Sequence, residues 1–209
     1  MHYPDLTKSV EPATLSLVGL TPMLAVCTTL LSGLSMGLAY LAVLILTSVT
    51  ASCGRRFISG RFKLVYLLLI SAAWVSIIDL LLQAWCYPIR NQLGIYLFLL
   101  AMNTTLLFHL EASTLQQSFR ECARASVKTA LTGATLLTVM GLSRELTAQG
   151  GILTDIHLLS HVERLASLQP FYIFTSGLHL FDSSAGAFIV FGLLLAALSL
   201  PTPGGIRSS

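Results

Sequence analysis

Two long apolar stretches of the chain are each interrupted by a short polar step, and these steps are where we expect chemistry. The first step is Gly19-Leu20-Thr21-Pro22 and the second is Met102-Asn103-Thr104-Thr105. A proline or an Asn-Thr pair frees backbone polar groups, and lipid offers such groups no hydrogen-bond partner. Interrupted helices at comparable places in two halves of a chain are typical of inverted repeats with a functional centre near the bilayer midplane. Gly19, Pro22 and Asn103 are therefore the predicted broken-helix backbone of a site.

The composition places the chain among integral membrane proteins. Apolar residues make up 55% of its 209 residues, charged residues only 10%, and the mean hydropathy is +0.80. Soluble domains carry about 25% charged residues. The net charge of +3 is modest and indicates loop topology instead of a nucleic-acid partner.

Six stretches are long and apolar enough to cross a bilayer as helices. They are Ala13–Leu34, Ser35–Ser52, Leu64–Trp85, Leu93–Leu110, Ser126–Leu142 and Ala185–Leu200. We expect an all-α integral membrane protein with a single domain over residues 1–209. Repeat one covers about 13–85 and repeat two about 93–200, with broken helices in the first and fourth spans.

Two local predictions accompany these spans. Gly33 and Gly37 are predicted to form the turn between the first two spans. The apolar segment Phe171–Phe181 is predicted to lie in the membrane interface, or to form a short re-entrant element.

The basic residues of the short loops predict the orientation, because cytoplasmic loops carry an excess of Lys and Arg. With six spans, one side of the membrane holds both termini and nine of the twelve basic residues, and the other side holds three. The nine are Lys8, Arg55, Arg56, Arg61, Lys63, Arg120, Arg124, Lys128 and Arg207, and the three are Arg90, Arg144 and Arg164. Both termini are therefore predicted to be cytoplasmic.

Short segments along the chain together resemble a known family. They are Val18–Val26, Ile78–Trp85, Gly94-Ile95, Met102–Thr104, Glu111-Ala112, Arg144-Glu145 and Gly186–Phe188. In order and spacing, over roughly residues 14–200, they resemble the E subunit of the Rnf complex. They are also similar to its close relative, the D subunit of the sodium-pumping NADH:quinone reductase.

The resemblance implies a subunit of two inverted three-helix repeats in a bacterial inner membrane, paired with a homologous A-type subunit of opposite orientation. In that family, cysteines of the broken spans in both subunits hold one intramembrane [2Fe–2S] cluster. Thiolates are the usual ligands of such clusters. The cluster relays electrons across the membrane, coupled to Na⁺ or H⁺ movement. Flavin and NAD are expected on other subunits, because this chain has no P-loop and no Rossmann glycine pattern.

The chain departs from the family at the two expected cysteines, which are Thr21 and Thr104 here. A threonine hydroxyl has no thiolate-like state at neutral pH, so these positions cannot supply a standard four-cysteine cluster. Three interpretations stay open: the partner and other ligands hold the cluster, the cluster is lost, or Cys27 substitutes after a local shift. Cys27 lies six residues beyond Thr21.

Several charged residues within or near the spans are further candidates. Asp79 lies in an apolar run, where a carboxyl group marks an ion path, a subunit contact or a capped acid near the interface. His109 and Glu111 close the fourth span and are predicted to be solvated. Arg144-Glu145 is predicted to pair locally or to face a neighbouring subunit.

We therefore expect a membrane subunit of an Rnf-type ferredoxin/NAD oxidoreductase complex that catalyses nothing alone. With the A-type subunit it would form the transmembrane electron conduit. The alternatives are a small secondary transporter, whose broken helices bind a solute directly, and a cluster-less scaffold paralogue. Stoichiometric copurification with redox partners distinguishes a conduit subunit from a transporter that works alone.

Overall fold

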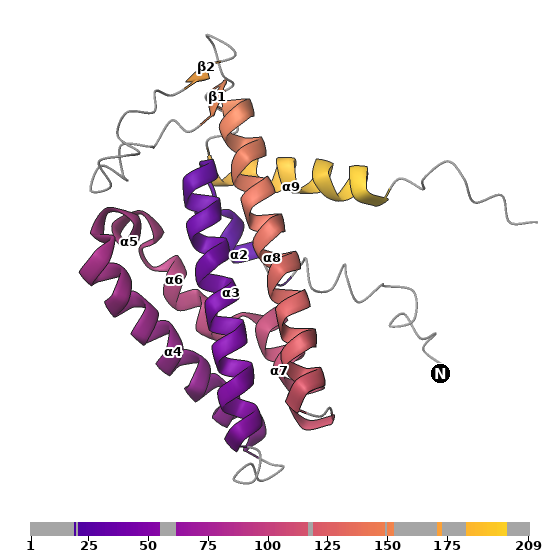
Figure 1. Cartoon of the computed structure of the whole chain (residues 1–209). Helices are drawn as coiled ribbons and strands as arrows, with labels where there is room; N and C mark the ends of the chain where they lie inside the picture. Colours follow the sequence, from indigo (N-terminus) through magenta and orange to yellow (C-terminus); the bar gives the residue numbers. More distant parts are fainter. Residues whose placement is uncertain are drawn as a thin grey trace, which may run out of the picture.

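The computed structural model describes residues 19, 21–54, 62–116, 119–148, 150–152, 171–172 and 183–199, and these are almost entirely helical (Figure 1). The helices are α2 (Thr21–Leu24), α3 (Leu30–Cys53), α4 (Lys63–Trp85), α5 (Tyr87–Leu93), α6 (Tyr96–Leu99), the 3-10 helix η3 (Leu100–Met102), α7 (Thr104–Gln116), α8 (Phe119–Ala148) and α9 (Ser184–Ser199). The two-residue strands β1 (Gly151–Ile152) and β2 (Phe171–Tyr172) pair antiparallel.

Within this described part, three helices are long and apolar enough to cross a membrane: α3, α4 and α8. A fourth span results if α5 and the segment Tyr96–Glu111, which meet at a bend of 67°, are counted as one. Gly94 ends α5 with a φ of 51°, a left-handed conformation that glycine adopts without steric cost. The described chain is thus a multi-span helical membrane protein, and the six spans and inverted repeats stay a prediction.

The predicted turn at Gly33 and Gly37 is wrong, because both glycines lie inside α3. The chain turns earlier, between α2 and α3. Thr29 then starts α3 with a capping box: its hydroxyl accepts from the Ser32 amide at 3.4 Å, and the Ser32 hydroxyl accepts from the Thr29 amide at 3.0 Å. Such reciprocal bonds satisfy two amides that the first helical turn leaves without partners.

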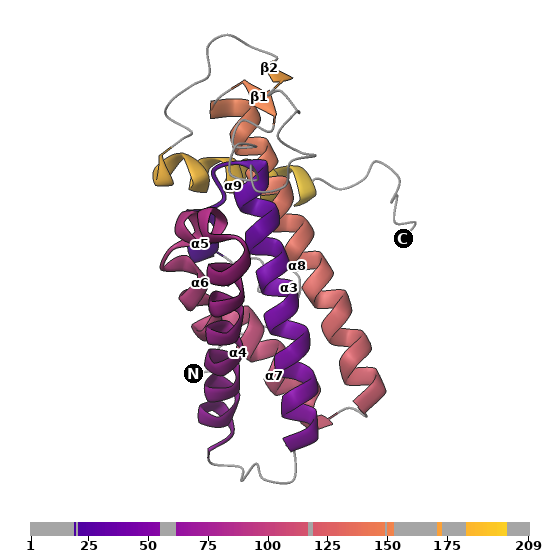
Figure 2. The same cartoon turned by 60° about the vertical axis from the view of Figure 1, so that its left-hand side comes forward.

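The two glycines serve close helix packing instead of a turn. α3 and α8 lie side by side and run antiparallel (Figures 1 and 2). A Cβ atom on Gly33 would lie 2.6 Å from the Leu137 carbonyl oxygen, and one on Gly37 would lie 2.9 Å from that of Ala134. Small residues let transmembrane helix backbones approach closely, which explains glycines in the interior of a long helix.

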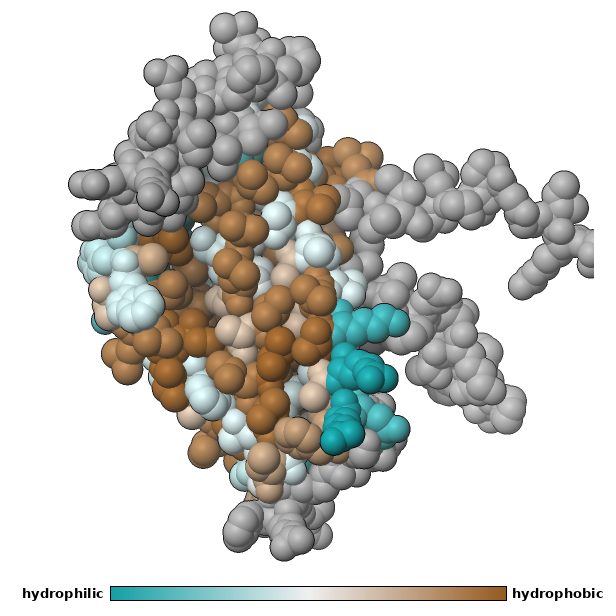
Figure 3. Space-filling view, viewed as in Figure 1, coloured by the Kyte–Doolittle hydropathy of each residue, from teal (hydrophilic) through white to brown (hydrophobic). Residues whose placement is uncertain are grey.

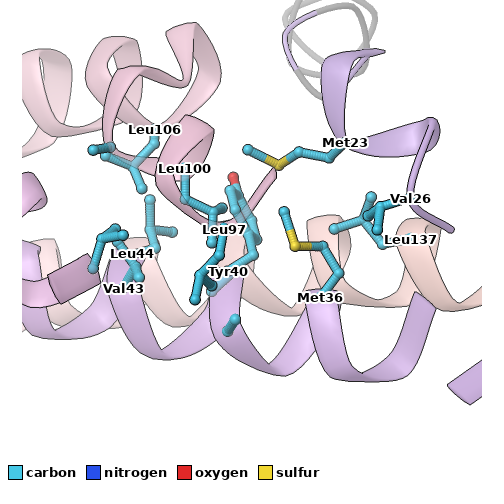
Figure 4. Packing of buried hydrophobic residues seen from close by; sticks show 14 of the residues in the cluster. Met23, Val26, Met36, Tyr40, Val43, Leu44, Leu97, Leu100, Leu106 and Leu137 are labelled. Atoms are coloured by element: carbon cyan, nitrogen blue, oxygen red, sulfur yellow. The ribbon is translucent and has the colours of Figure 1, made fainter. Parts of the chain in front are cut away.

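Apolar side chains from α2, α3, the α6–α7 segment and α8 meet in one buried cluster (Figure 4). Met23, Met36, Tyr40 and Leu100 are among its members. The outer surface is also apolar over much of the face shown in Figure 3. Apolar groups on both the inside and the outside are what a lipid environment requires.

The C-terminal elements differ in part from the predicted sixth span. α9 has 16 residues, about 24 Å at 1.5 Å per residue, against roughly 30 Å of hydrocarbon. In Figures 1 and 2 it lies across the bundle near the ends of α3 and α8. The predicted interfacial segment Phe171–Phe181 falls outside the described residues, apart from Phe171 and Tyr172 in β2.

Close packing of α3 against α8 predicts that Gly33→Ala destabilises the protein by about 1–3 kcal/mol, because the added methyl group meets backbone atoms. Gly192→Ala in α9 is the matched control, since a Cβ atom there meets nothing within 4 Å. It should be neutral or slightly stabilising, because alanine favours helices by up to about 1 kcal/mol over glycine. Thermal unfolding in detergent tests both variants, and equal midpoints would contradict the packing interpretation.

Candidate functional site

The structure brings the two polar steps of the sequence into direct contact. The Asn103 side-chain amide donates to the Gly19 carbonyl oxygen at 3.0 Å. A Cβ atom on Gly19 would lie 2.8 Å from the Thr104 hydroxyl oxygen and closer still to that of Thr105. Gly19 therefore occupies a position where α7 leaves no room for a side chain.

Asn103 has a second function, as the residue that starts α7. It is 4% exposed and extended, with φ −66° and ψ 123°, between η3 and α7. Its side-chain oxygen accepts from the Leu106 amide at 3.2 Å, the usual geometry of an N-cap. One side chain thus begins the second half-helix and binds a carbonyl of the first step.

The predicted ligand positions Thr21 and Thr104 each open a helix, α2 and α7 respectively. Thr21 is half-buried and Thr104 is exposed. Pro22 follows in the first turn of α2, where a missing amide costs no helical hydrogen bond. Gly19 before them is helical, and Leu20 lies outside the described residues.

Cys27 is fully buried in the connection between α2 and α3. Its thiol donates to the Met23 carbonyl oxygen at 3.3 Å, and its own carbonyl oxygen accepts from Arg144 at 3.1 Å. Its sulfur is therefore engaged locally with the end of α2.

Arg144 on α8 is the residue on which this connection depends most, and sequence reasoning missed its role. It is 1% exposed. Its Nη1 group donates to three carbonyl oxygens, those of Leu24 at 3.1 Å, Ala25 at 3.4 Å and Cys27 at 3.1 Å. The last carbonyls of a helix have no partner within it and carry partial negative charge, so a guanidinium group satisfies both needs.

The same side chain also reaches the segment before α9. Nη2 of Arg144 donates to the Ser183 carbonyl oxygen at 3.3 Å. The neighbouring carboxylate of Glu145, also fully buried, accepts from the Leu30 amide at 2.8 Å. Arg144-Glu145 therefore satisfies both ends of the α2–α3 connection, a contact that neither predicted role included. In the sequence, the position of this charged pair at the end of a long apolar run was the feature that could have indicated buried partners.

Asp79 is buried and lies in a hydrogen-bonded ion pair. Its two carboxylate oxygens accept from Arg90 Nε at 3.0 Å and Nη2 at 3.4 Å. The Gln83 amide donates to the same carboxylate at 2.8 Å. The pair joins α4 to α5, and a role of Asp79 in an ion path or in subunit pairing stays a prediction.

The predicted solvated end at His109 is wrong. His109 is half-buried, and its ring nitrogens lie 3.0 Å from the Ser126 hydroxyl and 3.3 Å from the Thr129 hydroxyl. Ser126 in turn donates to the Ser48 hydroxyl at 2.7 Å. This polar chain connects α7, α8 and α3, and such hydrogen bonds between transmembrane helices stabilise their packing.

The class of protein follows from this geometry: a multi-span helical membrane protein built around interrupted helices whose breaks meet in the interior. Comparison of sequences then identifies the family. Residues 7–195 match the family described as Rnf-Nqr subunit, membrane protein, and the chain belongs to it. The resemblance noted from the short segments is thereby confirmed.

Individual relatives are named as the E subunit of an ion-translocating oxidoreductase complex. The protein of Pseudomonas aeruginosa strain UCBPP-PA14 is 33% identical over 187 residues, covering 89% of this chain and 78% of the relative. That of Haemophilus influenzae strain PittGG is 32% identical, covering 89% and 80%. That of Haemophilus ducreyi is 33% identical over 192 residues, covering 90% and 83%.

The Arg144 contacts predict a large effect of its removal. Arg144→Met keeps the unbranched stem of the side chain but removes the guanidinium group, which leaves the carbonyls of Leu24 and Cys27 without their donor. We therefore expect the free energy of unfolding to fall by roughly 3 kcal/mol. Arg124→Met is the matched control, because Arg124 is exposed on the same helix and should change stability by less than about 0.5 kcal/mol. Denaturant unfolding in detergent measures both variants. Similar losses for the two would show that the carbonyl contacts contribute nothing.

Proposed function

We propose that this chain is a membrane subunit of an Rnf-type ferredoxin/NAD oxidoreductase complex, and that it forms the transmembrane electron conduit with a homologous A-type subunit. Electron transfer through the complex would be coupled to Na⁺ or H⁺ translocation. The contact between Gly19 and Asn103 carries the proposal, because it joins the two interrupted helices at one point inside the bundle. Membership of the Rnf-Nqr family and the names of the relatives support it.

The proposal includes six spans in two inverted repeats, in a bacterial inner membrane, with both termini cytoplasmic. Two observations support the repeats. A break precedes a long helix in each half, α2 before α3 and α7 before α8, and these two long helices run antiparallel (Figures 1 and 2). Antiparallel equivalents are what a two-fold axis in the membrane plane produces.

The side chains present do not fit an iron–sulfur cluster held by this chain. The family positions carry the hydroxyl groups of Thr21 and Thr104, and the Cys27 thiol donates to a backbone carbonyl. We therefore propose that any cluster in the complex takes its ligands from other subunits.

A second candidate is a scaffold subunit without a redox centre, which the two threonines favour. A small transporter has less support: Asp79, which could recognise a cation, is already bound to Arg90. We keep Asp79 in the proposal as a subunit contact or part of an ion path. An Asp79→Asn complex that moves as many ions per electron as wild type would exclude the ion path.

Iron content tests whether this chain supplies cluster ligands. The chain is copurified with its sister membrane subunit alone and examined by iron analysis and low-temperature EPR. We expect no reducible signal that depends on this chain, because its hydroxyl groups remain protonated. Thr21→Cys/Thr104→Cys should gain iron in the same pair, since thiolates are the usual ligands.

The matched control is Thr132→Cys/Thr135→Cys, which places the same new thiols on an exposed part of α8 and should gain no iron. A reducible signal in the wild-type pair that disappears with Cys27→Ser would overturn the proposal, because Cys27 would then be a ligand.

A further inference from the structure

One face of α8 changes from cationic to apolar along the helix. Arg120, Arg124 and Lys128 are exposed and four residues apart, so they lie one above the other. Leu131, Thr135 and Val139 continue this side of the helix toward its C-terminus, and all three are exposed. Leu131 and Val139 are 49% and 47% exposed, and the Thr135 hydroxyl donates to the Thr132 carbonyl oxygen at 2.9 Å. Figure 3 shows hydrophilic side chains gathered at one side of the lower half of the molecule, next to apolar surface. We call the three cations the basic stripe.

Contacts between α8 and α3 indicate how deep in the membrane the basic stripe lies. Cys122 lies 3.4 Å from the Ser52 hydroxyl, next to the end of α3 at Cys53. Lys128 follows six residues later, about 9 Å further along the helix axis at 1.5 Å per residue. The headgroup layer of one leaflet is about 5–8 Å thick. Taking the end of α3 as the membrane surface, we infer that the stripe extends from the headgroup layer into the first part of the hydrocarbon.

Helix geometry directs the cationic groups toward the headgroups. Side chains on a helix tilt toward its N-terminus, so those of Arg124 and Lys128 lean toward Arg120. Long basic side chains keep their stems along apolar surface while their charged ends reach the polar layer. Of the described acids at this end, Glu111 pairs with Lys63 at 3.2 Å. Glu121 lies three residues before Arg124, a neighbouring position on the helix, so one carboxylate accompanies the three cations. The described part of this end of α8 thus carries an excess of positive charge, with three cations against one acid.

We propose that the basic stripe binds the phosphate of an anionic phospholipid, with Leu131 and Val139 in contact with its acyl chains. Arginine binds phosphate with a planar fork of donors. A phospholipid has an anionic group and hydrocarbon chains in one molecule, in the order in which α8 presents cations and apolar residues. An acidic surface of another subunit would also attract the cations, but it would not explain why Leu131 and Val139 are exposed beside them. This inference does not depend on the proposed redox function.

Lipid selectivity tests the proposal. The protein, in the assembly in which it is extracted, is placed in phosphatidylcholine vesicles with either spin-labelled phosphatidylglycerol or spin-labelled phosphatidylcholine. EPR then measures the immobilised fraction of each lipid. We expect a preference of about fivefold or more for phosphatidylglycerol, the factor that one cation near an anionic headgroup supplies. Salt should weaken it.

Variants connect that preference to the stripe. Arg120→Gln/Arg124→Gln/Lys128→Gln should remove it, whereas the charge-preserving control Arg120→Lys/Arg124→Lys should keep most of it. Unfolding midpoints confirm that both variants are folded. A preference that survives the triple variant, or none in the wild type, would overturn the proposal. So would loss of a copurifying subunit in the triple variant with unchanged lipid preference, because the stripe would then bind protein.

Discussion

The structure depends on one constraint: backbone polar groups exposed by a broken helix inside an apolar bundle must be paired by the protein itself. Arg144 and Glu145 meet this constraint at the α2–α3 connection, and Asn103 meets it at the contact with Gly19. Without these side chains, the interruptions would leave carbonyl and amide groups without partners in a medium of low dielectric constant. The chain has few charged residues, and two of them, Arg144 and Glu145, form hydrogen bonds with backbone groups of the α2–α3 connection.

Close packing of α3 and α8 places these side chains. The glycines on the two helices bring their backbones together, so that Arg144 and Glu145 reach the turn before Leu30 directly. At the other end of the same contact, Ser126 reaches Ser48 and extends the hydrogen bonds to His109. The two long helices therefore hold both half-helices in position from one shared interface.

Sequence reasoning predicted the class, the family and the polar steps, because composition and hydrophobic runs are local properties of the chain. It placed the turn at Gly33 and Gly37. Glycine occurs both in turns and at close contacts between helices, and the sequence alone does not show that α8 packs against these two glycines. The charged pair Arg144-Glu145 beside a long apolar run indicated that these residues have partners. The partners of Arg144 could not be predicted, because they are backbone carbonyls about 120 residues away. The Thr29–Ser32 capping box was a local signal that would have placed the turn correctly.

Affinity purification from native membranes tests most directly whether the chain is a subunit of an Rnf-type complex. Quantitative mass spectrometry and cofactor analysis would identify the proteins and cofactors that copurify with it. A membrane subunit of an Rnf-type complex should be recovered with a homologous membrane subunit and with flavin- and iron–sulfur-bearing subunits in equal amounts. Recovery of the intact, folded chain without any of these, together with solute transport by the chain alone, would contradict the assignment to an electron-transport complex.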